Sequence, residues 1–192
     1  MSVTVEKCLQ AWTNSLRQMN AKADIVFFGD SLTYYGDFAS LFPNKVVFNL
    51  GLRGDTIQGM IDRVEQVKLL EPKQVFLMAG INDVANCSVE EFGKQYETLV
   101  LKLKELLPDA SIVIQSMLPV NNRDFSISCN NELIEICNKA IEKIAEFFDL
   151  KYIDLYELYF QEGVLSNLDT MDGLHIKRES YYKWFQGLRR YY

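Results

Sequence analysis

Short apolar runs alternate with longer amphipathic stretches along the chain. Most of the runs are continuously apolar and lack the alternation of a half-exposed strand. They cover residues 25–28, 46–48, 74–78, 111–114 and 152–155. Continuous apolar strands are typical of a parallel sheet that is covered on both faces. The pattern therefore predicts five buried parallel strands.

Between these runs, apolar residues recur with helical spacing and form five stripes that we expect to face the core. The stripes cover residues 5–19, 57–67, 92–107, 133–148 and 181–188. Thr4 is expected to cap the first helix. Ser88 and Glu91 form a capping box for the third helix, which Pro108 ends. Strands that alternate with helices imply βαβ crossovers and a three-layer α/β/α sandwich.

Length and composition narrow the class of protein. The 192 residues predict a single domain over 1–192, and 48% hydrophobic with 24% charged residues excludes a disordered chain. Lys and Arg number 20 against 26 Asp and Glu, and the net charge of −6 argues against a nucleic-acid partner. Since no 18-residue apolar run occurs, no membrane span is predicted. The first twenty residues lack a signal peptide's apolar core, so we expect a cytoplasmic protein unless a leader has been removed.

The cysteines and the histidine limit the available chemistry. Cys8, Cys87, Cys129 and Cys137 show no CxxC spacing, so they predict neither a zinc site nor a redox pair. We expect them to be small buried hydrophobic side chains, and their spacing does not indicate a disulfide. His175 is the only histidine, which excludes any mechanism that needs two.

Polar residues follow four of the predicted strands, at the edge where α/β sheets form their sites. Ser31 begins a helix after the first strand, Gly51 follows the second, and Asn82 follows the third. After the fifth strand, Asp172 precedes His175 by three residues, so its carboxylate can orient the imidazole. Each residue alone has a structural explanation, such as a helix cap or a turn. Together they supply the nucleophile, oxyanion donors and oriented base that acyl transfer needs.

In their order and spacing, these segments resemble the sequence blocks of the SGNH hydrolases, also called the GDSL esterase/lipase family. The segments are Gly29-Asp30-Ser31-Leu32, Asn49-Leu50-Gly51, Gly80-Ile81-Asn82-Asp83 and Asp172-Gly173-Leu174-His175. The resemblance extends from Ile25 to Trp184. It implies a flavodoxin-like sheet of five parallel strands in the order 2-1-3-4-5.

The resemblance also implies a role for each candidate site residue. Ser31 would be the nucleophile, His175 the base, and Asp172 the residue that orients the base. The oxyanion hole would consist of the Ser31 and Gly51 backbone N–H groups and the Asn82 side chain. The resemblance implies no metal and no cofactor.

The sequence indicates the substrate less closely than it indicates the catalytic residues. The chain resembles acetylhydrolases of the platelet-activating-factor type and carbohydrate acetylesterases. The resemblance implies a small-molecule ester substrate with a short acyl group. Acetyl is the first acyl group to expect, including acetyl groups carried by a carbohydrate. Tyr34, Tyr35 and Phe38 either wall an acyl pocket or pack in the core. Arg53 stands where those relatives often have glycine, and it adds a cation near the rim. Residues 121–124 either line the rim or form a solvated loop.

Other functions stay open at this point. One is a thioesterase or lysophospholipase that acts on longer acyl chains. Another is a flavodoxin-like binding module in which Ser31 only caps a helix, although the Asp30 carboxylate would repel a bound phosphate. A third is a carbohydrate-binding protein that kept the site without turnover. Asp83 is interpreted as structural, and no oligomeric state is indicated.

Overall fold

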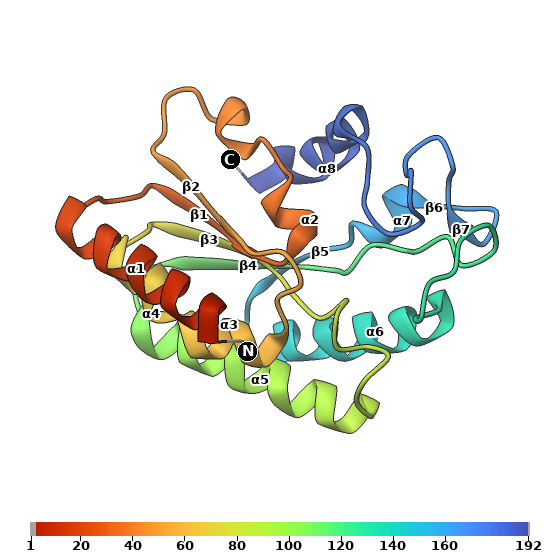
Figure 1. Cartoon of the computed structure of the whole chain (residues 1–192), viewed down its shortest axis with the longest axis horizontal. Helices are drawn as coiled ribbons and strands as arrows, with labels where there is room; N and C mark the ends of the chain where they lie inside the picture. The colour runs from red at the N-terminus through yellow and green to blue at the C-terminus, as the bar shows by residue number, and fades with distance from the viewer. Residues whose placement is uncertain (1–2, 192) are drawn as a thin grey trace.

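The computed structural model describes residues 3–191, with a central sheet between two layers of helices (Figure 1). All five strands are parallel, in the order β2-β1-β3-β4-β5. They are β1 (Ile25–Gly29), β2 (Val47–Gly51), β3 (Gln74–Met78), β4 (Ser111–Gln115) and β5 (Lys151–Ile153). The predicted three-layer α/β fold and its strand order are confirmed.

Helices connect the strands and cover both faces of the sheet. The α-helices are α1 (Val3–Met19), α2 (Ser31–Tyr34), α3 (Ile57–Arg63), α4 (Glu65–Leu69), α5 (Val89–Leu106), α6 (Asn131–Phe147), α7 (Tyr156–Tyr159) and α8 (Tyr181–Leu188). Short 3₁₀ helices are η1 (Phe38–Leu41), η2 (Arg178–Ser180) and η3 (Arg189–Tyr191), and a small hairpin pairs β6 (Phe160–Gln161) with β7 (Val164–Leu165). The helix expected to begin at Ser31 is present as α2, whereas α7 and the hairpin were not predicted, because each is too short to show a period.

The sheet has an apolar core on each face, because successive side chains of a strand point to opposite sides. Val26 and Phe28 of β1 pack in the core that α1, α3, α4, α5 and α6 cover. Ile25 and Phe27 pack in the other core, under α2, η1, α7 and α8. The same continuous apolar runs therefore contribute side chains to both cores, as a parallel sheet covered on both faces requires.

Side-chain caps fix where several helices begin. Ser88 accepts a hydrogen bond from the Glu91 N–H while the Glu91 carboxylate accepts one from the Ser88 N–H, so the predicted capping box is present. Thr56 caps α3 and Asn130 caps α6 in the same way. The capped helices all follow the carboxyl ends of strands, so caps help to shape that edge of the sheet.

Three expectations about helices were wrong. The first helix begins at Val3, so Thr4 lies inside α1 and is not its cap. Among the described side chains of the α1 stripe, Leu16 is buried but Trp12 and Met19 are exposed, and α1 packs chiefly on α4. The second stripe forms two short helices, α3 and α4, which meet at Val64.

The cysteines with described side chains are free thiols. Cys129 and Cys137 are buried and Cys87 is half-buried, as expected for small hydrophobic side chains. Burial raises the pKa of Cys137 to about 11, which keeps this thiol protonated. The side chain of Cys8 lies outside the described residues.

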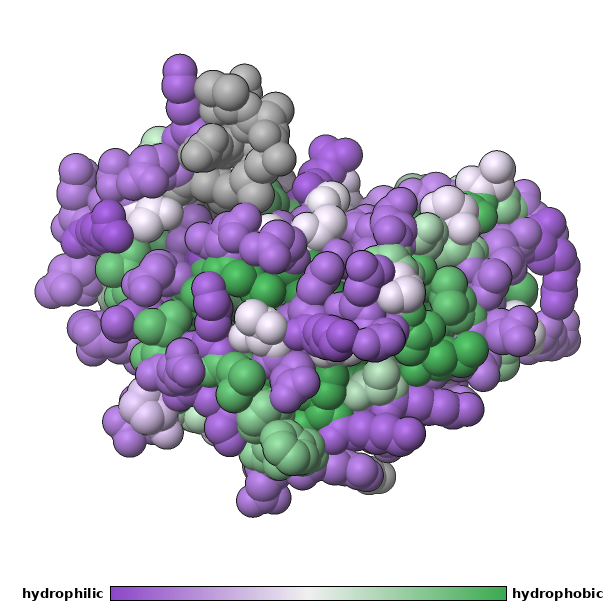
Figure 2. Space-filling model, turned by 90° about the horizontal axis from the view of Figure 1, so that it is seen from below, coloured by the Kyte–Doolittle hydropathy of each residue, from purple (hydrophilic) through white to green (hydrophobic). Residues whose placement is uncertain are grey.

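The face below the sheet in Figure 1 carries charged side chains with apolar groups showing between them (Figure 2). Leu101 of α5 and Ile136 and Phe147 of α6 are the exposed large apolar residues of these two helices. Most of the apolar positions of these two helices are buried against the sheet, as the stripes predicted. Within residues 3–191, no helix is both long and apolar enough to cross a membrane.

Candidate active site

The register of the sheet brings three loops together at the carboxyl ends of the central strands. Gly29 of β1 lies beside Gly51 of β2 and beside Met78 of β3. Ser31 opens α2 two residues after β1 ends, and Asn82 follows β3 by four residues. The segments that carry Ser31, Gly51 and Asn82 are therefore neighbours, although they are far apart in the sequence.

A chain of hydrogen bonds links a serine, a histidine and an aspartate at this edge. Ser31 Oγ lies 2.9 Å from His175 Nε2, across 144 residues of sequence. His175 Nδ1 lies 2.6 Å from Asp172 Oδ2. In this geometry one imidazole nitrogen can accept the serine proton while the carboxylate fixes the other nitrogen as a donor.

The Asp172 carboxylate is held in its charged form. Its Oδ1 accepts backbone N–H groups of Leu174 at 3.0 Å and His175 at 2.7 Å. Desolvation acts against ionisation, but the hydrogen bonds from the His175 side chain and from these two N–H groups together hold the pKa of Asp172 below its ordinary value. Asp172 is thus suited to stabilise a protonated imidazole.

The loop that carries Asp172 and His175 is fixed by buried polar contacts. The Thr170 hydroxyl donates to the His175 carbonyl at 2.7 Å and accepts the Gly173 N–H at 2.9 Å. Gly173 has a φ of +83°, and a Cβ there would lie 2.7 Å from Phe125 and 2.9 Å from the Asn121 carbonyl. Glycine is required for both reasons.

The three groups expected to form the oxyanion hole differ in whether their hydrogens are already bonded. Ser31 is the first residue of α2, so its N–H has no acceptor within the helix. Asn82 Nδ2 donates one hydrogen to the Asp55 carbonyl at 2.7 Å and has a second. The Gly51 N–H is already engaged, because it donates to Asn49 Oδ1 at 2.8 Å. It would reach a substrate oxygen only by sharing that hydrogen in a three-centre bond, or after Asn49 turns away.

Asn49 joins the loop at Gly51 to the turn that follows Ser31. Its Nδ2 donates to the carbonyls of Thr33 at 2.8 Å and Gly36 at 2.9 Å, while its Oδ1 holds Gly51. A Cβ at Gly51 would lie 2.2 Å from the Tyr34 nitrogen, so the close approach expected at this glycine is present.

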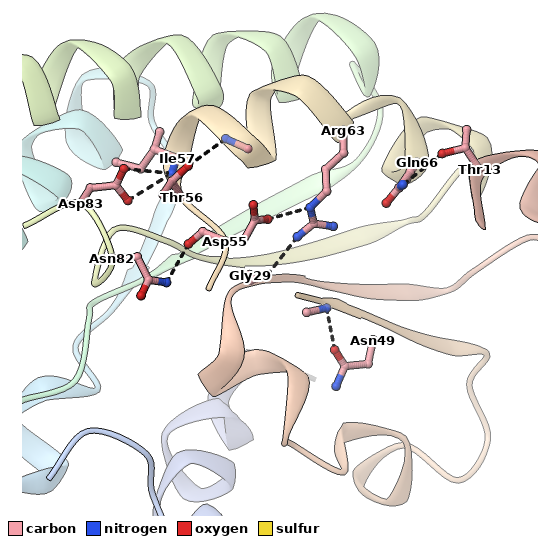
Figure 3. Close-up of polar contacts among 12 residues, drawn as sticks. Thr13, Gly29, Asn49, Asp55, Thr56, Ile57, Arg63, Gln66, Asn82 and Asp83 are labelled. Atoms are coloured by element: carbon pink, nitrogen blue, oxygen red, sulfur yellow. Dashed lines mark hydrogen bonds and ion pairs between the residues drawn. The ribbon is translucent and has the colours of Figure 1, made fainter. Parts of the chain in front are cut away.

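A buried ion pair lies beneath the site and touches two of its strand ends (Figure 3). Arg63 Nε donates to Asp55 Oδ2 at 2.7 Å, and the side chains are only 4% and 3% exposed. Arg63 also donates to the Gly29 carbonyl at 3.0 Å and stacks on Phe28 at 4.4 Å. The Asp55 carbonyl in turn accepts Asn82 Nδ2. We call Arg63, Asp55, the Gly29 carbonyl and Asn82 the Arg63 network.

Asp83 has the structural role that its sequence position suggested. Its two carboxylate oxygens accept the Ile57 N–H, at 3.1 and 3.3 Å, at the start of α3 (Figure 3). Burial raises the pKa of Asp83 to about 6, although the bond from Ile57 opposes the rise. Asp83 thus fixes α3, whose other end supplies Arg63.

Asp30 is a fully buried carboxyl group beside Ser31. Its Oδ1 caps α2 by accepting the Leu32 N–H at 2.9 Å, while its buried Oδ2 has no partner among the described residues. Burial, reinforced by the charges of Asp55 and Asp83, raises the pKa of Asp30 to about 7, against the opposing effects of the Leu32 bond and Arg63.

We expect Asp30→Asn to stabilise the protein at neutral and alkaline pH. The unfolded chain releases this proton near the ordinary value of 3.8 and the folded chain only near 7, so the folded protein loses stability as pH rises through this window, by up to ~4 kcal/mol. Asparagine keeps the cap and carries no charge. Urea unfolding of both proteins from pH 4.5 to 8 should show the gain growing with pH. Exposed Asp37→Asn is the control, and an equal gain at all pH values would contradict the prediction.

The match to known families decides the identity of the chain. Residues 27–182 match the GDSL-like lipase/acylhydrolase family, which is well over half of the sequence. The chain belongs to the GDSL-like lipase/acylhydrolase family. The resemblance seen in the sequence blocks is confirmed.

Proteins that are similar in sequence or in structure are consistent with this family membership. A platelet-activating factor acetylhydrolase IB subunit beta homolog from Drosophila melanogaster is 33% identical over 50% of this chain and 45% of its own length. A GDSL-like lipase from Bacteroides thetaiotaomicron has a TM-score of 0.78 at 20% identity, covering 95% of each chain. A catalytic mutant of an acetylxylan esterase from Geobacillus stearothermophilus has a TM-score of 0.72 at 17% identity, covering 88% of this chain and 94% of the other. The chain spans less than half the length of the curated relatives it matches.

In this GDSL-family protein, the aromatic residues after Ser31 have different environments. Phe38 is a core residue, stacked on Phe27 with ring centres 3.9 Å apart, so it cannot wall a pocket. Tyr34 and Tyr35 are exposed at the site edge, and the Tyr35 ring meets the His175 ring edge-on at 5.5 Å. Arg53 Cζ lies 5.8 Å from the Tyr35 ring centre.

The segment 121–124 is neither a plain rim nor a freely solvated loop. Asn121 is buried, donates its backbone N–H to the Gly173 carbonyl at 2.7 Å, and bonds Asn167 and Asp124 through its side chain. Arg123 donates to the Glu162 carbonyl at 2.7 Å. The segment therefore supports the loop that carries His175.

Sequence reasoning missed Asn49, Asp55, Arg63 and Thr170 as residues that shape the site of the GDSL-family protein. A signal existed for Arg63, which lies three residues after Met60 and one before Val64 on the apolar stripe of α3. A charge at such a position is rarely buried without a partner. Among residues 3–191, no three His, Cys, Asp or Glu side chains cluster as a metal site would need.

Proposed function

We propose that this protein is a serine esterase that removes short acyl groups, with a preference for acetyl, from hydroxyl groups of small molecules. The observation that carries the proposal is the unbroken chain of hydrogen bonds from Asp172 through His175 to Ser31 Oγ. Family membership and esterases among the structural neighbours support ester hydrolysis as the reaction class.

In the proposed mechanism, Ser31 Oγ attacks the ester carbonyl carbon as its proton passes to His175 Nε2. The carbonyl oxygen becomes an oxyanion, which accepts hydrogen bonds from the Ser31 N–H, the Asn82 amide and a shared Gly51 N–H. The bond to the alcohol oxygen then breaks, and His175 gives its proton to that oxygen. Water attacks the acyl-enzyme in the second half, with His175 again as base, and releases the acid and free Ser31.

The surroundings of Ser31 favour a short acyl group. Leu32 and Phe38 next to it are fully buried in the core, and Tyr34 and Tyr35 stand on the surface. Of these four side chains, only the two exposed tyrosines are accessible to an acyl group bound at Ser31. Because the Geobacillus neighbour is an acetylxylan esterase, acetylated xylan is a natural first substrate to test.

A chain-length series tests the proposal against the longer-chain alternatives. We expect kcat/KM for p-nitrophenyl esters to be highest for acetate and to fall steadily toward octanoate. A maximum at eight carbons or longer would contradict the short-acyl proposal and favour a lysophospholipase or thioesterase. Covalent labelling of Ser31 by a fluorophosphonate, absent after prior denaturation, is expected as well. Unlabelled Ser31 in the folded protein would favour a binding module.

A further inference from the structure

Arg53 is an exposed cation at the edge of the candidate site. It lies two residues beyond Gly51, in the turn between β2 and α3. Its Cζ lies over the Tyr35 ring, 5.8 Å from the ring centre, and the Tyr35 and His175 rings meet nearly at right angles with centres 5.5 Å apart. Arg53 and His175 therefore both contact the same aromatic ring.

Nothing in the described part of the chain neutralises Arg53. The ion pairs within residues 3–191 use other cations, and Arg53 makes no hydrogen bond to a side chain or carbonyl there. By contrast, Arg63 pairs with Asp55 and Arg123 bonds the Glu162 carbonyl. Acidic residues exceed basic ones, 26 to 20, so an unpaired cation beside the site is not a result of excess positive charge.

The contact with Tyr35 gives the guanidinium a place beside the site. A guanidinium carries five N–H donors, and a cation–π contact does not require a hydrogen bond from any of them. A planar fork of donors matches the two oxygens of a carboxylate. Arg53 is therefore suited to receive a carboxylate that arrives with the substrate.

We propose that Arg53 binds a carboxylate on the alcohol part of the ester substrate, so that the enzyme prefers O-acyl hydroxy acids to neutral esters. The inference rests on the proposed function. In that mechanism His175 returns a proton to the leaving alcohol oxygen, so the alcohol part of the ester must lie beside His175. Arg53 and His175 both contact the Tyr35 ring, so we choose test substrates that carry the carboxylate and the ester oxygen on one six-membered ring. Acetylated hydroxybenzoates and acetylated sugar acids are of this kind.

The test compares two acetate esters that differ in one charge, 4-acetoxybenzoate and its methyl ester. The ratio of their kcat/KM values is measured in the wild type and in Arg53→Gln, so that differences in intrinsic reactivity cancel. We expect Arg53→Gln to lower the ratio, anion over neutral ester, about three- to tenfold. The change should appear mainly in KM for the anion, and 0.5 M salt should shrink it in the wild type.

Arg17→Gln is the matched control, because it removes the same charge at the opposite, amino end of the strands and should leave the ratio as in the wild type. Arg53→Lys, which keeps the charge but loses the planar fork, should give an intermediate ratio. An equal loss on both esters, or an equal ratio in all variants, would overturn the role of Arg53 while the esterase proposal stands. Absence of Ser31-dependent turnover of either ester would overturn both.

Discussion

Replacing Ser31 by alanine is expected to lower kcat/KM for p-nitrophenyl acetate by a factor on the order of 10⁴ or more. The substitution removes the hydroxyl that lies 2.9 Å from His175 Nε2, and no other side-chain hydroxyl is bonded to that nitrogen among residues 3–191. His175→Gln should cause a similar loss, since the chain has no second histidine. The Ser31→Ala/His175→Gln double variant should lose little more than either single variant, because the residues act as one unit.

The matched control is Ser40→Ala, in which the lost hydroxyl only bonds the Asp37 carbonyl in η1. It should keep the wild-type rate. Urea unfolding checks that Ser31→Ala folds normally, which we expect because alanine fits the space of a buried serine. A folded Ser31→Ala protein that retained more than a tenth of the wild-type rate would contradict the proposed acyl-enzyme.

Replacing Arg63 by leucine is expected to lower the free energy of unfolding by about 3–5 kcal/mol. The variant leaves the Asp55 carboxylate buried without its partner and removes a donor from the Gly29 carbonyl. Burial already raises the pKa of Asp55, and Arg63 is the group that opposes the rise. Without Arg63, Asp55 should hold a proton to higher pH, so the loss of stability should be larger at pH 8 than at pH 5. An equal loss at both values would contradict this account.

The Asp55→Leu/Arg63→Leu pair provides the control for stability. Removing both charges leaves no buried unpaired ion, so much of the lost stability should return. Urea unfolding of the single and double variants measures it. A double variant no more stable than Arg63→Leu would show that packing, and not charge, dominates at this place.

Arg63 should also affect catalysis through Asn82, because the Asp55 carbonyl fixes the Asn82 amide. Asn82→Ala is expected to lower kcat by a factor on the order of 10². If Arg63 acts by positioning Asn82, then Arg63→Leu should lower kcat in the wild type but have little further effect in Asn82→Ala. Additive losses in this double-mutant cycle would instead indicate a general structural effect.

The elements with long patterns could be predicted from the sequence, because burial of an apolar face is a local property of the residues that form it. The five strands and helices α5, α6 and α8 appeared where apolar spacing placed them. The exposed part of α1 could not be foreseen, since its stripe says nothing about how much of it a neighbour covers. The break at Val64 between α3 and α4 also depends on packing and not on spacing.

The candidate site was predictable where a residue's position relative to a strand end determines its role. Ser31, His175 and Asp172 lie together as their blocks suggested. The polar supports were not predictable, because partners such as Arg63 and Gly29, or Asn49 and Gly36, meet only after the sheet has formed. The engagement of the Gly51 N–H by Asn49 is likewise a property of side-chain geometry.

The presence of one histidine makes this site unusually open to direct observation. In a proton NMR spectrum the imidazole C–H signals of the 22.2 kDa protein belong to His175 without any assignment experiment. The protonation of this ring can be followed through a pH titration in the wild type, in Ser31→Ala and after fluorophosphonate labelling. Selective carbon-13 labelling with histidine would place a single reporter at the reacting centre, so each step of an acylation cycle could be watched at one atom.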